Sequence, residues 1–188
     1  MGRGSFFVLE VFMDTGTQRL FLTEQNIRLH RDYLRRLKLE HSINEKSIPE
    51  IKGKSAYEIS RMGLARRDKW EIIEKMKRIK AHECYFSSFG ARGTRCAAVS
   101  KRYSSEDSFL YELKQLAKGA ESGFLYVYKD ERGNPNMSLS SPSDDFFIRR
   151  LPILALDLCE HAYFADYGFE YERYLENALP FLNLSRLL

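Results

Sequence analysis

The chain contains four histidines, His30, His41, His82 and His161, and three of them fall in segments with an ordered pattern. The last has a carboxylate four residues before it, in the run Asp157-Leu-Cys-Glu-His161. Three imidazoles and one carboxylate suit a redox-active first-row metal, because imidazole suits iron and carboxylate suits manganese and other hard ions. A DxxxH pair also recurs by chance, so its spacing alone is a weak signal.

Helical patterns place two of these histidines inside regular elements. Thr23 is a plausible N-cap for a helix in which Ile27 and Leu37 recur at helical spacing, so His30 lies about two turns inside it. Residues 41–55 contain a proline and a glycine and indicate a turn-rich connection. After Gly63 a long helical pattern carries Trp70 and Tyr85 near one side, with His82 towards its C-terminal end.

The second half of the chain mixes helix and strand patterns. Ser105 precedes a helix whose first turn is acidic and which ends near Gly119. Phe124 to Tyr128 is aromatic and β-branched, and the turn residues 132–135 that follow predict a β-hairpin. Residues 148–157 read as a third strand that is apolar and ends at Asp157. A last helical stretch, 171–188, has an apolar tail that we expect to dock on the body.

Composition indicates a soluble globular protein, with 44% hydrophobic and 30% charged residues in 188. Residues 28–80 carry 16 Lys and Arg against 8 Asp and Glu, which reads as solvated helix faces or as a field that attracts a small anion. A third reading, nucleic-acid binding, is supported by no recognition motif in the sequence. The three cysteines form no CxxC pair, and residues 1–16 resemble neither a membrane span nor a signal peptide. We therefore expect a cytoplasmic protein with no membrane or nucleic-acid partner.

Residues 156–176 resemble the C-terminal signature of the iron/manganese superoxide dismutases. Seven residues match over eleven positions, namely Asp157, Glu160, His161, Ala162, Tyr163, Asp166 and Tyr167. Upstream, residues 80–89 are similar to the family's helix that carries the second ligand, and residues 24–30 to the helix that carries the first. Residues 123–128 resemble the strand that starts the family's sheet.

The resemblance implies a metal centre and an activity. Its ligands would be His30, His82, Asp157 and His161, holding one iron or manganese ion per chain. Superoxide would be the substrate, converted to oxygen and hydrogen peroxide as the metal alternates between two oxidation states. The resemblance further implies a homodimer, in which Glu160 reaches the partner's ligand histidine and Tyr163 lies at the same interface.

Two departures from the family pattern lie near these ligands. Cys159 stands where the family usually has Trp, either as an inert buried thiol or as a thiol close to a redox centre. The family's Tyr eight residues after the first ligand is replaced by Lys38, and Tyr33 is our candidate for its catalytic role. An alternative register would put Asn26 at the ligand position and move His30 to a supporting place.

A third departure concerns the Gln or His that hydrogen-bonds the solvent on the metal. Arg78 stands at the Gln position of the iron type, and residues 137–145, where the manganese type has its Gln, contain neither Gln nor His. Such a gap shifts the redox potential, so an active dismutase and a non-catalytic metal-binding homologue are both open. A third possibility is an interaction module whose basic helices bind an acidic partner without a metal. The sequence leaves iron and manganese as equal alternatives.

The order of the elements predicts an α+β fold. Residues 1–90 would form an N-terminal helical hairpin lobe. Residues 91–188 would form a C-terminal lobe with a three-stranded antiparallel sheet flanked by helices.

Overall fold

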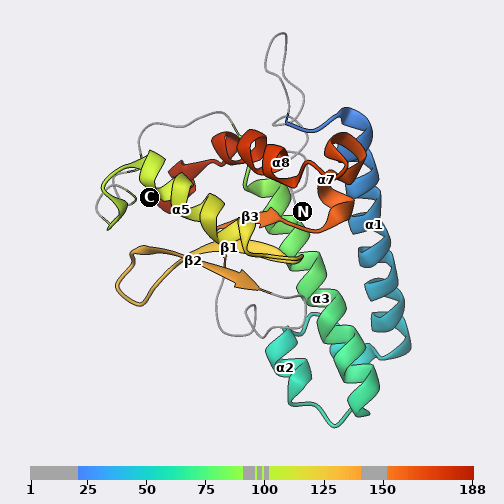
Figure 1. Cartoon of the computed structure of the whole chain (residues 1–188). Helices are drawn as coiled ribbons and strands as arrows, with labels where there is room; N and C mark the ends of the chain where they lie inside the picture. Colours follow the sequence, from blue (N-terminus) through green and yellow to red (C-terminus); the bar gives the residue numbers. More distant parts are fainter. Residues whose placement is uncertain (1–20, 91–95, 97–98, 100–101, 141–151) are drawn as a thin grey trace, which may run out of the picture.

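The computed structural model describes residues 21–90, 96, 99, 102–140 and 152–188 (Figure 1). Its helices in these ranges are α1 (Glu24–Ser47), α2 (Ala56–Ser60), α3 (Arg66–Ser87), α5 (Glu106–Lys118), α7 (Glu160–Tyr167) and α8 (Tyr171–Ala178). Its strands are β1 (Phe124–Lys129), β2 (Pro135–Ser140) and β3 (Leu154–Asp157). Short 3-10 turns cover Pro49–Ile51, Leu179–Phe181 and Leu184–Leu187. Within the described ranges no helix is long and apolar enough to cross a membrane.

The three strands form one antiparallel sheet in the order β2-β1-β3. The central strand β1 is buried along most of its length, since α5 packs against it and α3 packs against its neighbour β3. Figure 1 shows α1 and α3 running side by side beyond one end of the sheet, with α7 between α1 and the sheet. The predicted α+β fold, with N-terminal helices followed by a three-stranded sheet flanked by helices, is confirmed.

Helix α1 begins where the sequence predicts and ends later. The Thr23 side chain accepts a hydrogen bond from the backbone N–H of Asn26, which is an N-cap contact. The helix continues to Ser47, so the prediction of a turn-rich segment from residue 41 was wrong for its first seven residues. Ile48 ends the helix with φ −131° and ψ 79°, because a residue that precedes a proline is disfavoured in the α region.

Helix α3 buries only part of the predicted side. Tyr85 is buried, whereas the Trp70 side chain is 58% exposed. The first turns of α3 contribute Ile72 and Ile73 to a small apolar cluster with Ile51 and Ile59. Which face the first turns of α3 bury depends on how residues 49–60 pack against them. The helical repeat of α3 alone does not specify this packing.

The main core lies between the sheet, α3, α5 and α8. The predicted docking of the C-terminal tail is confirmed, since Leu184 and Leu187 are buried and Phe89 forms an isolated antiparallel bridge with Leu182. The tail therefore closes the apolar layer beside the C-terminal end of α3. The proposed division of the chain after residue 90 stays a prediction.

Candidate metal centre

His82 lies near the C-terminal end of α3, with its side chain buried. Its Nδ1 lies 2.6 Å from the carbonyl oxygen of Arg78, one helical turn earlier. A carbonyl oxygen only accepts, so Nδ1 carries the proton and donates it. Burial lowers the pKa of His82 to about 4, although the nearby Asp157 carboxylate opposes this effect. The imidazole is therefore neutral at pH 7, and the lone pair of Nε2 can be donated to a metal ion.

His30 reaches the same point from α1 and is also buried. The aromatic rings of Tyr85 and Phe86 lie 4.9 and 5.0 Å from its ring, between centroids, and hold the imidazole on one side. Among the described residues, neither ring nitrogen of His30 has a hydrogen-bond partner. Two buried ring nitrogens without a hydrogen bond are costly, which favours a metal ion as a partner at this point.

Asp157 is the last residue of β3 and pairs with Phe124 in the sheet register. Its backbone carbonyl accepts a hydrogen bond from the Tyr174 hydroxyl at 2.8 Å, and its Oδ1 accepts one from the Cys159 N–H at 2.9 Å. Burial alone would raise the pKa of the Asp157 carboxyl, but the imidazoles of His161 and His30 outweigh burial and hold it far below its usual range. The carboxylate is thus ionised, and the sheet and these hydrogen bonds fix its position at the end of β3.

His161 stands in the first turn of α7, four residues after Asp157. Its side chain is 41% exposed, whereas the other three side chains of the cluster are almost inaccessible. Burial lowers the pKa of His161, but the adjacent Asp157 carboxylate outweighs burial and the pKa is raised overall. The cluster therefore has one side that is open in the single chain.

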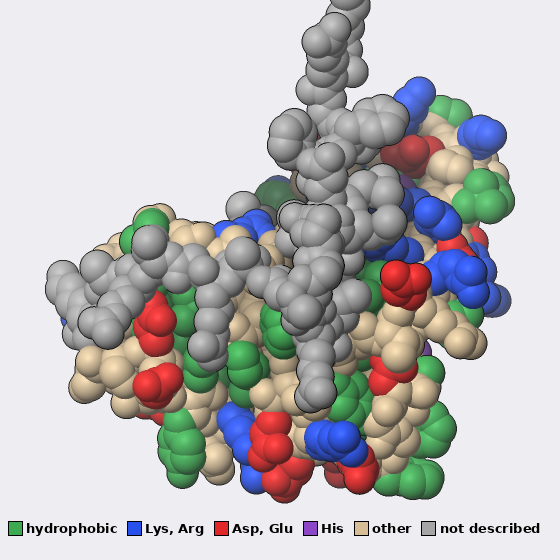
Figure 2. All heavy atoms as spheres, turned by 90° about the horizontal axis from the view of Figure 1, so that it is seen from above, with side chains coloured by type: hydrophobic (Ala, Val, Ile, Leu, Met, Phe, Trp, Pro, Cys, Tyr) green, Lys and Arg blue, Asp and Glu red, His purple; other side chains and the backbone are tan. Residues whose placement is uncertain are grey.

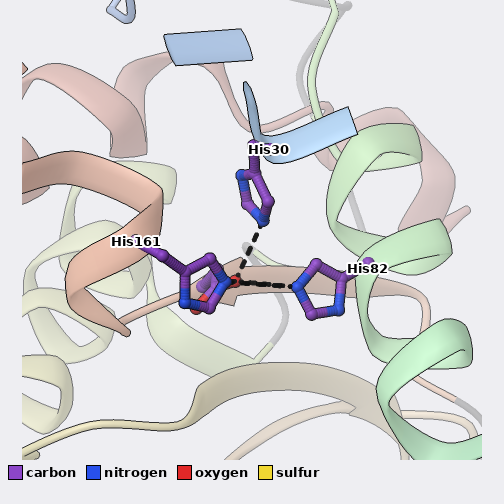
Figure 3. Close-up of side chains that lie close together, drawn as sticks. His30, His82 and His161 are labelled. Carbon is purple, nitrogen blue, oxygen red and sulfur yellow. Dashed lines mark hydrogen bonds and ion pairs between the residues drawn. The ribbon is translucent and has the colours of Figure 1, made fainter. Parts of the chain in front are cut away.

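The four side chains converge on one point between α1, α3, β3 and α7 (Figure 3). Oδ2 of Asp157 lies 3.2, 3.5 and 3.1 Å from the Nε2 atoms of His30, His82 and His161 respectively. The Nε2 atoms of His82 and His161 are 3.3 Å apart, and all four ligand atoms lie within 4.8 Å of one another.

The four separations of 3.1 to 3.5 Å fit a first-row metal ion. Ligand atoms about 2.1 Å from an ion are separated by roughly 3.0 to 3.6 Å for angles of about 90 to 120°. The His30–Asp157 approach lacks hydrogen-bond geometry, so Oδ2 of Asp157 and Nε2 of His30 are buried without a hydrogen-bond partner in the described part of the chain. A donor set of three imidazoles and one carboxylate that face inward is the set that iron or manganese would take.

Tyr33 lies at the edge of the cluster, one turn beyond His30 on α1. Its ring centroid is 5.1 Å from those of both His82 and His161. The guanidinium carbon of Arg36 lies 5.5 Å from the centroid of the Tyr33 ring, within cation–π range. In Figure 2, Lys and Arg side chains gather on the side of the molecule where α1 lies. A phenol and a cation thus lie beside the four candidate ligands.

The remaining residues singled out in the sequence occupy different surroundings. Cys159 is half-buried, and burial followed by the Asp157 carboxylate raises the pKa of its thiol to about 12, so it stays protonated at neutral pH. Arg78 is exposed and serves the site through its backbone carbonyl. Glu160 is exposed, whereas Tyr163 is buried against the rings of Tyr171 and Tyr174.

Two supporting contacts were missed from the sequence. The Tyr174 hydroxyl holds the backbone at Asp157, and Asn26 bridges α1 to α7 instead of occupying a ligand position. The structure brings His30, rather than Asn26, to the other three side chains. Asn26 is fully buried, and its partners in α7 are 136 and 140 residues away, so no local pattern pointed to its role.

Comparison with known proteins gives one family. The model described as iron/manganese superoxide dismutases, C-terminal domain, matches residues 91–187, just over half of the 188 residues. The matched range includes Asp157 and His161, whereas His30 and His82 precede it. No curated protein matches the chain.

Proposed function

The chain belongs to the iron/manganese superoxide dismutase family, and from this membership we propose that it disproportionates superoxide to oxygen and hydrogen peroxide. The observation that carries the proposal is the convergence of three imidazoles and one carboxylate within 4.8 Å. The ions that suit this donor set are those the family uses, iron or manganese.

We propose His30, His82, Asp157 and His161 as the ligands of one iron or manganese ion per chain. When bound, such an ion supplies one-electron redox chemistry between two oxidation states. The Asp157 carboxylate offsets part of the positive charge. The His82 Nδ1–H bond to the Arg78 carbonyl holds that ring with Nε2 facing inward.

The residues around the ligands would handle the proton and the anion. Forming hydrogen peroxide from two superoxide anions consumes two protons, and the Tyr33 phenol at the edge of the cluster would hold one at its hydroxyl. Arg36, whose guanidinium lies over that ring, would attract the small anion towards the open side of His161.

We further propose a homodimer with Glu160 and Tyr163 at its interface. Support comes from the family and from the exposed edge of His161, next to which the exposed Glu160 lies. A partner chain would cover this edge and exclude water from one side of the cluster. The proposed location is the cytoplasm, which rests on the amino-acid sequence alone.

A second candidate is a homologue in which the metal is structural. It is favoured by Arg78 at the position of the iron-type Gln and by the lack of Gln and His in residues 137–145. In that case metal removal lowers the melting temperature, since an ion that binds only the folded chain stabilises it, and no superoxide is consumed. An apo form as stable as the metal-bound form would speak against this candidate.

The test of the proposed function is metal content and superoxide consumption of the purified full-length chain. We expect about one iron or manganese per chain and disproportionation that Asp157→Asn abolishes together with metal binding. Asp107→Asn, which removes an exposed carboxylate in α5, is the matched control and should change neither. Stoichiometric metal without superoxide consumption would overturn the dismutase proposal and leave the structural candidate.

A further inference from the structure

The three histidines of the cluster are held in different ways. His82 is oriented by its own hydrogen bond to a backbone carbonyl, and His161 follows Asp157 closely in the chain. His30 has no hydrogen-bond partner on either ring nitrogen among the described residues. Its ring is confined by neighbouring rings, so its position depends on where α1 lies relative to α7 and α3.

One carboxylate joins α1 to α7 close to the cluster. Oδ2 of Asp166, in the last turn of α7, accepts hydrogen bonds from the Thr23 N–H at 2.8 Å and from Nδ2 of Asn26 at 3.0 Å. Oδ1 accepts a third from the Thr23 hydroxyl at 2.7 Å. Nδ2 of Asn26 also donates to the carbonyl oxygen of Ala162 at 3.2 Å, in a buried place.

These contacts adjoin the ligands in the chain. Asn26 precedes His30 by one helical turn, and Ala162 follows His161 directly. The Asp166 carboxylate also lies at the N-terminus of α1, where the helix dipole favours negative charge. A shift of the Asp166–Asn26 contact would therefore carry the His30 side chain along the axis of α1 relative to His161.

We propose that Asp166, acting through Thr23 and Asn26, is a positioning residue that sets the place of His30 in the metal centre. The inference rests on the metal site of the proposed function. It assigns the Asp166 carboxylate a role beyond capping a helix, because the contact determines the geometry in which four inward-facing ligand atoms meet. Small displacements matter here, since ligand distances in metal sites vary by only about 0.2 Å.

The experiment compares Asp166→Ala and Asp166→Asn with Glu176→Gln in the full-length chain. The control removes a carboxylate that joins two helices elsewhere, since Glu176 contacts Lys114 at 2.7 Å between α8 and α5. Each purified protein is stripped with a chelator and titrated with Mn²⁺ for affinity and with Co²⁺ for its visible absorption spectrum. The Co²⁺ spectrum reports ligand geometry, which a purely structural role would leave unchanged.

We expect Asp166→Ala to weaken Mn²⁺ binding about ten-fold or more and to alter the Co²⁺ spectrum. Asp166→Asn should bind Mn²⁺ with an affinity between those of Asp166→Ala and wild type. Its amide oxygen still accepts a hydrogen bond, whereas its amide N–H faces another donor. Glu176→Gln should match wild type in both readouts. Wild-type affinity and spectrum in both Asp166 variants, with only a lower melting temperature, would overturn the proposal. Failure of wild type to bind either ion would instead overturn the metal site of the proposed function.

Discussion

The Nδ1–H of His82 donates to the backbone carbonyl of Arg78, one turn earlier in α3, over 2.6 Å. This contact leaves Nε2 of His82 as the inward-facing nitrogen, 3.5 Å from Oδ2 of Asp157. Because the acceptor is a backbone atom, the side chain at position 78 is free to differ from the family's Gln without disturbing the ring. The departure at Arg78 therefore affects what lies around the site and leaves the orientation of His82 intact.

The buried and neutral His82 predicts acid sensitivity of the metal-free protein. Burial lowers its pKa to about 4 in the folded chain, against about 6.5 in an unfolded one. Between these values the unfolded chain binds more protons, so the free energy of unfolding falls as the pH drops from 6.5 to 4, by up to about 1.4 kcal/mol per pH unit. Urea unfolding of the stripped protein across this range measures the slope.

The two other groups of the cluster with a shifted pKa contribute outside that pH range. His161 has a raised pKa, so below pH 6.5 it is protonated in both states and adds no slope, while its contribution is lost as the pH rises through its folded pKa. Asp157 has a lowered pKa and loses its contribution only below about pH 4. His82→Gln should flatten the slope. An unchanged slope in this variant would assign the acid sensitivity to other groups.

The sequence predicted the positions of the elements better than the contacts between them. Thr23 and Asp157 were found at the start of a helix and at the end of a strand because capping patterns and apolar runs are local. The length of α1 was underestimated. Pro49 disfavours the helical conformation only at Ile48, the residue before it, and residues 41–47 contain no Gly or Pro that would end the helix earlier. The contact between Asn26 and Asp166 spans 140 residues, and no local pattern encodes such a separation.

Tyr33→Phe tests the proton-handling role of the phenol. We expect superoxide turnover to fall at least about ten-fold, because proton transfer loses its positioned donor. Metal content should stay the same, since Tyr33 supplies none of the four clustered ligand atoms. Tyr57→Phe, which removes the hydroxyl of a half-exposed tyrosine on α2, is the control. Turnover is measured by stopped-flow decay of superoxide, and equal rates in both variants would exclude the role.

Arg36→Gln tests electrostatic attraction of the substrate. Within the described residues Arg36 has no carboxylate partner, and it lies over the Tyr33 ring. At low ionic strength we expect kcat/KM to fall about two- to five-fold, with a weaker dependence on salt, because the loss of one cation reduces the field near the site. Arg35→Gln is matched in charge and helix, but Arg35 is paired with Asp32 at 2.6 Å. Equal effects of the two substitutions would point to net charge alone.

The corner between α7 and α8 carries an apolar pair that tests the dimer. Phe169 is 92% exposed and Phe164 44%, and their rings meet edge to face with centroids 5.3 Å apart. Phe164 follows Glu160 by about one turn of α7, and exposed apolar rings favour burial, so we expect the pair to be covered in a homodimer. Burying a phenylalanine contributes about 2 kcal/mol, and two copies meet in a symmetric interface.

Phe169→Glu should therefore raise the dimer dissociation constant at least about a hundred-fold, as measured by analytical ultracentrifugation over a concentration series. Tyr111→Glu, which places the same charge on an exposed aromatic residue of α5, should leave it unchanged. Metal content of the Phe169→Glu monomer separates the roles of the two chains, because all four proposed ligands come from one chain. Retained metal with a lower turnover would mean that the partner closes the site. A wild-type chain that sediments as a monomer at all concentrations would rule out the homodimer.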